Sequence, residues 1–505
     1  MRESRGPVCA VITESTVDAA RSAIRRAGRV ADLIELRLDY LRDFDFADPA
    51  SLSPLLKDKP LPVIITCRAA PEGGRQKVDD EIRLRLLVEG ARRSADYCDI
   101  EAASYDDAAK MSPDLSRLIV SYHNFAGTPP DLNAVYDRVT ALPAAAYKIV
   151  TRANSISDSL AVFRLLDRAR IDGRAMIALA MSEPGAMTRI IGPGRGSFLT
   201  YASLERGGES APGQPTCGEL RDVFRIHRLT RDTAITGIVG SPVAHSASPV
   251  MHNLAFKSLG LDFVYLPFEV DDAGEFFKRF VLPATREIDW RLRGLSVTIP
   301  YKTSVAPFLD EIDATAERVG AVNTVVIRDG SVKGYNTDIE GAIRPLERVL
   351  PLDGQSCGVV GAGGAARAVT YGLTRKGARV KIFARDLSKA RGLAESFGVP
   401  VCPLDSLQSS DVQIVINTTP AGMRGHSERA SPVPPRALRG RLVAYDLIYN
   451  PLETQFLKDA RAEGCRVIGG LEMLVEQAAL QFELWTGEEA PVDLMRRAAL
   501  ERLSG

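Results

Sequence analysis

GVVGAGGAARAVTYGLTRKGARVKIFARD, residues 358–386, combines an apolar strand, a glycine-rich turn, a helix and a second apolar strand. This order is typical of a Rossmann lobe, in which glycines let the backbone approach a pyrophosphate at the helix N-terminus. Ala366 stands where the fingerprint accepts an alanine. We therefore predict a Rossmann lobe whose dinucleotide contacts come from the turn residues Gly361, Ala362, Gly363, Gly364 and Ala365.

The end of the second strand in this stretch predicts the kind of dinucleotide. Arg385 occupies the place where an NAD site usually has an acidic residue for the ribose 2′-hydroxyl. An arginine there favours the 2′-phosphate of NADP, so NADP(H) is the expected cofactor. We interpret the adjacent Asp386 as the N-cap of a helix from Leu387.

Polar residues just before the Rossmann stretch predict a carbonyl-reducing site. Lys302 ends SVTIPYK (296–302) and Asp338 closes GYNTD (334–338). Separately, they could be a solvated lysine and a helix N-cap. Together, an amine and a carboxylate could protonate the alkoxide that carbonyl reduction leaves.

A serine-rich turn further upstream has the pattern of an anion site. Ser248 and Pro249 are typical of a helix opening, with the hydroxyl at the N-cap and the proline at N1. Capping alone could account for Ser248. Because Ser246 adds a second hydroxyl beside the expected helix N-terminus, a carboxylate could also bind there.

The first half of the chain alternates strand-like and helical patterns. Such an alternation over ~220 residues predicts a (β/α)₈ TIM barrel, and we place its boundary with the second half near residue 231. The strand-like runs are residues 8–13, 33–39, 62–68, 97–102, 117–123, 145–150, 174–181 and 196–202.

Charged side chains at several of these strand ends predict catalysis at one mouth of the barrel. Lys148 lies within AAYKIV (145–150), where we expect Arg37 and Arg68 as neighbours that lower its pKa and make it an amine nucleophile. His123 could accept a proton beside it. Taken singly, Lys148 could be a structural ion pair, Arg37 could pair with Glu35, and His123 could be a core histidine.

Composition limits the class of protein. The 505 residues contain 64 Lys and Arg and 64 Asp and Glu, without a dense basic block, so we expect no nucleic-acid partner. The N-terminal stretch has no apolar leader and no apolar run reaches membrane-spanning length, so we expect a cytoplasmic protein without membrane contact. The seven cysteines form no CxxC pair, which argues against a zinc site, and we expect no metal.

The first half resembles type I 3-dehydroquinate dehydratase over about residues 7–215, through ELRLD, TCRAAPEGG, SYHNF, YKIV, MTRI and SAPGQ. The resemblance implies that Lys148 forms a Schiff base, that His123 removes the C2 proton and later protonates the departing hydroxyl, and that Glu72 orients His123. Glu72 could instead be solvated, and SAPGQ could be a plain turn. The implied contacts to substrate hydroxyls and carboxylate are Glu35, Arg37, Arg68, Arg189, Ser210 and Gln214.

The second half resembles shikimate dehydrogenase over about residues 234–500, through HSASP, SVTIPYK, GAVNTV, YNTDIEG, GAGGAARA, INTTPAGM, DLIYNPLETQFL and GLEMLVEQAA. The resemblance implies Lys302 and Asp338 as the catalytic pair. FARD departs from the usual NR(T/S), and SVTIP has serine where asparagine is common. The implied shikimate contacts are Ser246, Ser248, Thr298, Asn323, Tyr449 and Gln477, and further cofactor contacts are Asn417, Thr418 and Thr419.

The two resemblances together imply an α/β chain that carries out consecutive shikimate-pathway reactions, as in the fused enzyme type of plants. We expect a barrel at residues 1–230, a substrate lobe at 231–338 and 471–505, and an NADP-binding Rossmann lobe at 339–470. The expected partners are 3-dehydroquinate, 3-dehydroshikimate and shikimate, and the sequence is compatible with a homo-oligomer. The alternatives are a quinate-type dehydrogenase fused to another Schiff-base barrel, and an inactive regulatory homologue.

Overall fold

The computed structural model describes residues 6–111, 116–425 and 427–504. The first five residues of the N-terminal stretch, in which we expect no apolar leader, lie outside the described residues. The chain divides into two compact units. The first comprises Met1–Ala234, Leu266–Val281 and Thr285–Arg291, and the second comprises Ile235–Tyr265, Leu282–Ala284 and Leu292–Gly505. Among the described residues, no helix has both the length and the apolar character required to cross a membrane.

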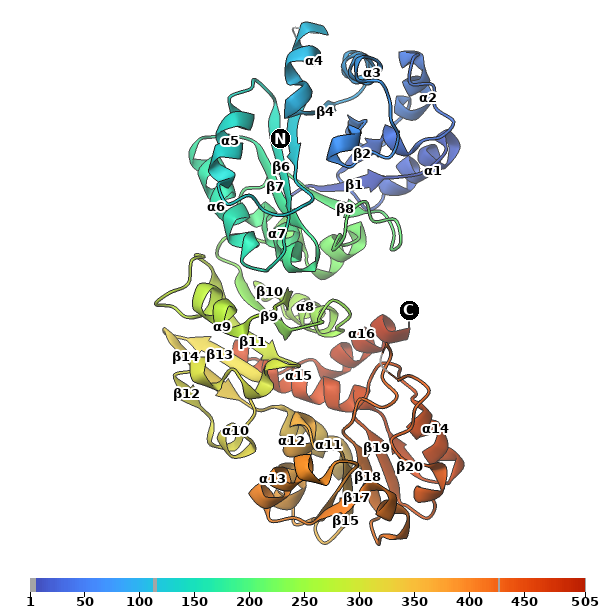
Figure 1. Cartoon of the computed structure of the whole chain (residues 1–505), viewed down its shortest axis with the longest axis vertical. Coiled ribbons are helices and arrows are strands. Elements are labelled where there is room, and N and C mark those ends of the chain that lie inside the picture. The colour runs from blue at the N-terminus through green and yellow to red at the C-terminus, as the bar shows by residue number, and fades with distance from the viewer. Residues whose placement is uncertain (1–5, 112–115, 426, 505) are drawn as a thin grey trace. The chain divides into compact units, whose positions relative to one another are not determined.

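The first half forms the predicted barrel. Its 8-stranded sheet has the order β7-β6-β5-β4-β3-β2-β1-β8, and neighbouring strands are parallel. The strands are β1 (Val8–Ile12), β2 (Leu33–Arg37), β3 (Val63–Thr66), β4 (Tyr97–Glu101), β5 (Leu118–His123), β6 (Ala146–Arg152), β7 (Met176–Met181) and β8 (Thr200–Ser203). The connecting helices, which lie outside the strands (Figure 1), are α1 (Val17–Ala27), α2 (Ser53–Leu56), α3 (Asp80–Arg93), α4 (Tyr105–Met111), α5 (Leu132–Thr140), α6 (Asp158–Ile171) and α7 (Ala186–Ile191).

Local sequence explains both the helices and the barrel interior. The Thr16 side chain accepts a hydrogen bond from the Ala19 N–H and so begins α1, which buries one apolar stripe of alanines and Ile24. The strands alternate, and their inward apolar side chains, such as Val11, Ile64 and Ile177, form a packed core. Charged side chains are therefore left for the carboxyl ends of the strands.

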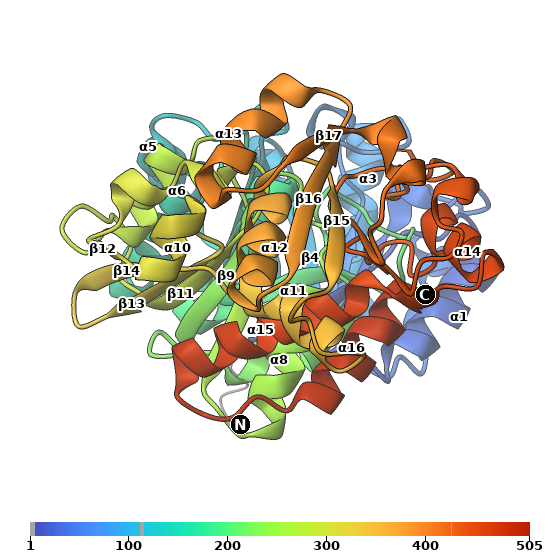
Figure 2. The same cartoon turned by 90° about the horizontal axis from the view of Figure 1, so that it is seen from below.

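The substrate-lobe sheet of the second half is mixed. It is 6-stranded, with the order β10-β9-β11-β13-β14-β12 and antiparallel pairing of β13 with β11 and with β14. Its strands are β9 (Ala234–Gly240), β10 (Phe263–Glu269), β11 (Arg291–Val297), β12 (Glu311–Ile312), β13 (Thr324–Arg328) and β14 (Ser331–Tyr335). Next to it, α8 (Ser248–Ser258), α15 (Gly470–Thr486) and α16 (Val492–Ser504) lie side by side around one apolar cluster (Figures 1 and 2). Short helices α9 (Ala273–Phe276) and α10 (Ala314–Val319) complete this region.

The third sheet confirms the Rossmann prediction. Its six parallel strands have the order β17-β16-β15-β18-β19-β20, which is the 3-2-1-4-5-6 order of a dinucleotide-binding fold. The strands are β15 (Ser356–Val360), β16 (Arg379–Ala384), β17 (Val401–Pro403), β18 (Ile414–Asn417), β19 (Val443–Asp446) and β20 (Arg466–Ile468). The helices are α11 (Asp338–Glu347), α12 (Gly364–Arg375), α13 (Leu387–Phe397) and α14 (Gln455–Ala462). The strand order changes direction between β15 and β18, although these strands are parallel, and such folds bind ligands at this switch point.

One of two predicted helix caps is confirmed, and the other is shifted by one residue. Asp386 caps α13 as predicted and accepts from the N–H groups of Ser388 and Lys389. The prediction that Ser248 is an N-cap with proline at N1 is wrong by one position, because α8 begins at Ser248 and its N-cap is Ala247. The Ser246 hydroxyl accepts from the Ser248 N–H at 3.2 Å, so the hydroxyl two residues earlier satisfies the free donor.

Candidate active sites

One cavity at the barrel strand ends collects all nine dehydratase residues that the sequence predicts. Strands and the segments that follow them bring these residues together, because the carboxyl ends of parallel strands meet at one mouth. Phe125 and Tyr201, which the sequence did not single out, also line this cavity. The nine predicted residues in its wall are Glu35, Arg37, Arg68, Glu72, His123, Lys148, Arg189, Ser210 and Gln214.

The Lys148 amine lies between two carboxylates. Its Nζ is 2.9 Å from Glu35 Oε1 and 2.9 Å from Asp99 Oδ2, and the side chain is 4% exposed. Arg37 and Arg68 line the same cavity as the lysine, as expected, but the groups in contact with the amine are the two carboxylates. Arg37 instead pairs with Asp39 through two hydrogen bonds, and not with Glu35.

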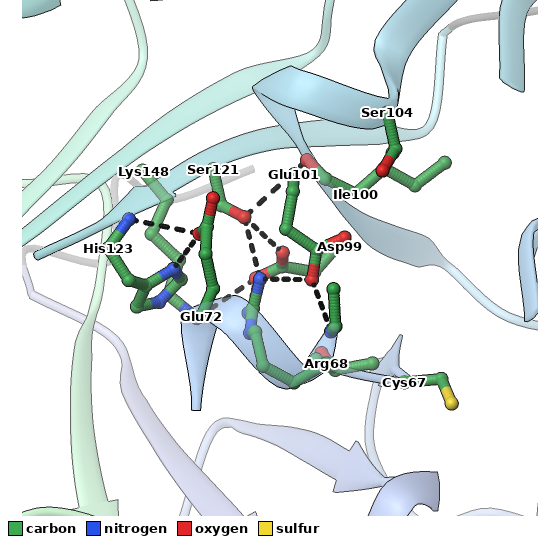
Figure 3. A network of polar contacts seen from close by, with 12 residues as sticks. Cys67, Arg68, Glu72, Asp99, Ile100, Glu101, Ser104, Ser121, His123 and Lys148 are labelled. Atoms are coloured by element: carbon green, nitrogen blue, oxygen red, sulfur yellow. Dashed lines mark hydrogen bonds and ion pairs between the residues drawn. The ribbon is translucent and has the colours of Figure 1, made fainter. Parts of the chain in front are cut away.

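A buried charge network that begins on β4 connects Arg68 with the carboxylates beside the amine (Figure 3). Arg68 pairs with Asp99 at 2.9 Å and with Glu101 at 3.0 Å, which leaves its guanidinium turned to carboxylates rather than to the amine. Burial alone would raise the pKa of Asp99, but the charges of Arg68 and Lys148 outweigh it and hold that pKa well below its usual range. Asp99 is thus a permanent anion beside the amine.

His123 and Glu72 form a dyad next to Lys148. Glu72 Oε2 lies 3.0 Å from His123 Nδ1 and also accepts a hydrogen bond from the His123 backbone N–H at 3.0 Å. Burial raises the pKa of Glu72 to about 7. Burial, followed by the charges of Arg68 and Lys148, lowers the pKa of His123, so the imidazole is neutral. With Nδ1–H donated to Glu72, Nε2 is the nitrogen left to accept a proton.

Arg189 is a buried guanidinium without a carboxylate partner among the described residues. Burial lowers the pKa of its guanidinium to about 10. Nη1 donates to the Tyr201 carbonyl at 3.3 Å, while Nε has no partner in the described part of the chain. Such a guanidinium in a cavity wall suits a bound carboxylate. On the same wall, Gln214 Oε1 accepts from the Ser210 N–H at 2.8 Å, which orders the SAPGQ loop.

The second predicted pair, Lys302 and Asp338, also comes together. Lys302 Nζ is 2.6 Å from Asp338 Oδ2, and the Asn323 amide donates to Asp338 Oδ1 at 2.8 Å. Asp338 is the first residue of α11, because Thr337 is the N-cap. Neither separate interpretation, a solvated lysine or an N-capping aspartate, describes this pair.

The other predicted shikimate contacts lie on several elements of the second half. Ser248 begins α8, Ser246 lies two residues before it, and Thr298 follows β11. Gln477 lies on α15, where a side chain on Gly341 of α11 would meet its Cβ at 2.8 Å. The glycine therefore allows α15 to approach the helix that carries Asp338. Tyr449 is partly buried against the apolar cluster of α8 and α15.

The glycine turn leaves space for a ligand. Gly361 has φ +120, and a Cβ there would meet the Thr418 hydroxyl at 2.6 Å, whereas nothing lies within 4 Å of a Cβ at Gly363 or Gly364. Helix α12 begins at Gly364 without a side-chain cap, so its first N–H groups face this open space. Arg385 is exposed just after β16. These features fit a dinucleotide with a phosphate near Arg385.

The Asn417–Thr419 loop is held by internal hydrogen bonds. The buried Asn417 amide donates to Asp446 Oδ1 at 2.9 Å, and Asn417 Oδ1 accepts from the Thr419 N–H at 2.9 Å. The Thr418 hydroxyl donates to the Val360 carbonyl at 2.7 Å. The Asn417 side chain thus shapes the loop that follows β18, and Thr418 ties this loop to β15.

The sequence reasoning missed three residues of the barrel site: Asp99, Glu101 and Tyr201. The signal was present, since alternation along YCDIE puts Asp99 and Glu101 on one face of a strand, as it does for ELRLD. Tyr201 lies two residues after Leu199 in the last strand-like run, so both side chains lie on the same face and belong to the barrel core.

Comparison with known proteins gives matches to both halves of the chain. The family model for type I 3-dehydroquinase matches residues 8–231. The shikimate dehydrogenase substrate binding domain matches residues 238–325, and the shikimate 5′-dehydrogenase C-terminal domain matches residues 470–500. A crystal structure of shikimate dehydrogenase in complex with NADP⁺ is 39% identical, with a TM-score of 0.51, and the match covers 54% of this chain and 96% of that one.

Two relatives extend these matches. The shikimate dehydrogenase (NADP(+)) of Pyrococcus abyssi is 44% identical over 271 residues, 53% of this chain and 98% of its own length. The chloroplastic bifunctional 3-dehydroquinate dehydratase/shikimate dehydrogenase of Arabidopsis thaliana is 36% identical over 513 residues, 96% of this chain and 83% of its own length. This chain therefore belongs to the family of fused type I 3-dehydroquinate dehydratases and shikimate dehydrogenases.

Proposed function

We propose that this chain dehydrates 3-dehydroquinate to 3-dehydroshikimate and then reduces 3-dehydroshikimate to shikimate with NADPH. The observation that carries the proposal is the convergence of Lys148, the His123–Glu72 dyad and Arg189 in one cavity. We assign the dehydratase to residues 1–230 and the dehydrogenase to 231–505. Within the latter, residues 231–338 and 471–505 form the substrate lobe, and 339–470 form the NADP lobe.

The dehydration begins at Lys148. Transfer of a proton from the ammonium to Glu35, 2.9 Å away, frees the amine to attack the substrate ketone. Loss of water then gives a protonated imine, which acidifies the adjacent C–H bond. His123 Nε2 takes the C2 proton and returns it to the hydroxyl that leaves as water. Hydrolysis of the imine releases the product and restores Lys148.

Substrate orientation in the barrel follows from charge. We assign the substrate carboxylate to Arg189, whose guanidinium has no carboxylate partner among the described residues. Ser210 and Gln214 stand on the same wall of the cavity. Glu35, Arg37 and Arg68 complete the polar wall that contacts the substrate hydroxyls.

In the second half, Lys302 and Asp338 handle the proton of the reduction. When bound, NADPH supplies the hydride for the substrate carbonyl. The Lys302 ammonium, held at 2.6 Å by Asp338, donates a proton to the carbonyl oxygen, and Asn323 fixes the other Asp338 oxygen. Ser246 and Ser248 at the start of α8 suit the substrate carboxylate, with Thr298, Asn323, Tyr449 and Gln477 around the ring.

We assign the cofactor to the crevice beside the glycine turn. Gly361, Ala362, Gly363, Gly364 and Ala365 offer backbone N–H groups to the pyrophosphate, and the loop Asn417–Thr419 borders the turn. Arg385 favours the 2′-phosphate of NADP(H) over the hydroxyl of NAD(H).

A coupled assay tests the whole proposal. Purified chain with 3-dehydroquinate and NADPH should form shikimate with stoichiometric NADPH oxidation, whereas either substrate alone should not. Oxidation of quinate with NADP⁺ in place of this reaction would favour the alternative of a quinate-type dehydrogenase fused to another barrel. Absence of both activities would favour the regulatory homologue.

A further inference from the structure

Tyr201 places an aromatic face against the reactive nitrogen of the barrel. Lys148 Nζ lies 4.1 Å from the centroid of the Tyr201 ring, and the tyrosine is 4% exposed. The amine is therefore enclosed by three groups: the carboxylates of Glu35 and Asp99 and this ring. The face of an aromatic ring attracts a cation and has no such attraction for a neutral amine.

The ring, rather than the hydroxyl, makes this contact. The Tyr201 hydroxyl is buried and has no hydrogen-bond partner among the described residues. Burying a hydroxyl without a partner disfavours the folded state, so the hydroxyl does not account for an aromatic residue at this position. Burial, followed by the nearby charge of Glu35, also raises the pKa of the phenol, which stays protonated.

Imine formation changes which of its contacts Lys148 Nζ can keep. The ammonium has three N–H groups and can donate to both carboxylates. When the N–C bond forms and the ketone C–O bond breaks, the oxygen leaves as water with two of these protons. The nitrogen keeps the third proton and the positive charge. One N–H serves only one carboxylate, whereas a contact with an aromatic face needs no N–H at all.

We propose that the Tyr201 ring stabilises the protonated imine on Lys148 and is a catalytic residue of the dehydration, an inference that depends on the Schiff-base function proposed above. Tyr201 is also tied to the opposite end of the expected substrate, because its backbone carbonyl accepts from Arg189 Nη1 at 3.3 Å. Tyr201 of β8 thus contacts Lys148 Nζ through its ring and Arg189 through its backbone carbonyl. It therefore sets the position of the nitrogen relative to the guanidinium that we assign to the substrate carboxylate. Lys148 and Arg189 would then keep their spacing through the reaction.

The first test compares Tyr201→Phe with Tyr201→Leu in the full chain. Tyr201→Phe keeps the ring face and removes the orphaned hydroxyl, so its dehydration kcat should stay within about threefold of the unchanged chain. Tyr201→Leu keeps an apolar side chain and removes the face, so kcat and the fraction of Lys148 trapped by borohydride with 3-dehydroquinate should fall roughly tenfold. Equal losses in the two variants would overturn the proposal.

A graded series keeps the test valid even if Tyr201→Leu fails to fold. Mono-, di- and trifluorinated phenylalanines at position 201 weaken the negative face of the ring with little change in its size. Dehydration kcat should fall stepwise with each fluorine, and a flat series would reject the ring's role. A borohydride adduct in the unchanged chain is the separate check on the Schiff base, because its absence would refute the proposed function itself.

Discussion

Glu72 Oε2 lies at hydrogen-bonding distance, 3.0 Å, from both the Nδ1 and the backbone nitrogen of His123. A single carboxylate oxygen thus holds the imidazole by its ring and by its main chain. This geometry selects the tautomer in which Nε2 is free, provided that the carboxylate is ionised. When protonated, Glu72 can donate to Nδ1 instead, which moves the ring proton to Nε2 and removes the base.

The first prediction concerns pH. Because burial raises the pKa of Glu72 to about 7, dehydration kcat/KM should fall as pH decreases below about 7. Glu72→Gln should lower kcat by roughly 100-fold and abolish this acidic limb, since the amide does not titrate. Initial rates from pH 5.5 to 9 measure both effects. An identical acidic limb in the variant would assign the titration to another group.

The second prediction separates the two halves. Lys148→Ala removes the nucleophile, so dehydration and borohydride trapping should disappear, while NADPH-dependent reduction of 3-dehydroshikimate stays within about twofold. Lys148→Arg is the matched control, because it retains a cation between Glu35 and Asp99 without a nucleophilic amine. It should also lose dehydration, with a thermal stability closer to that of the unchanged chain. A parallel loss of reductase activity in both variants would contradict two separate sites.

The third prediction applies the same logic to the reductase. Lys302→Met should reduce kcat for 3-dehydroshikimate by roughly 10²–10⁴-fold, because the proton donor is lost. Asp338→Asn should reduce it as well, since Lys302 loses its carboxylate at 2.6 Å. The dehydration rate of the same preparations is the control for folding and concentration. Near-normal reduction by Lys302→Met would show that the proton comes from elsewhere.

The fourth prediction concerns the cofactor. Arg385→Ala should raise the KM for NADPH roughly 10–100-fold, because a charged hydrogen bond contributes about 1.5–3 kcal/mol. The KM for NADH should change little, as that cofactor has no 2′-phosphate. Initial rates with each cofactor give the ratio. Equal effects on both cofactors would place Arg385 away from the 2′ position.

The fifth prediction compares two glycines of one turn. Gly361→Ala forces a side chain onto φ +120 and against the Thr418 hydroxyl at 2.6 Å, so it should destabilise the second half by about 1–3 kcal/mol. Gly363→Ala meets no atom within 4 Å, so it should leave unfolding unchanged but raise the KM for NADPH. Thermal unfolding with NADPH titration distinguishes them. Equal destabilisation by both would mean that the space beside Gly363 is not a ligand site.

The sequence alone determined the elements and their order. Alternating apolar strands and helices predicted the barrel, and the glycine-containing stretch at residues 358–386 predicted a Rossmann lobe, because periodicity and turn chemistry are local properties. The same local reasoning placed Lys148, His123, Lys302 and Asp338 at the ends of elements. Strand ends of a parallel sheet meet at one edge, so the convergence of Lys148 and His123 followed.

Only the tertiary structure decided which charges are neighbours. Lys148 contacts Glu35 and Asp99, which lie 113 and 49 residues away in the chain, and the sequence alone did not predict these two contacts. Spacing along a strand shows which face a side chain occupies but not which group on another strand lies opposite it. Two features of the tertiary structure decide which groups are neighbours: the stagger between strands, and the ion pairs of Arg68 with Asp99 and Glu101. A buried charge pairs with the nearest opposite charge that the fold provides.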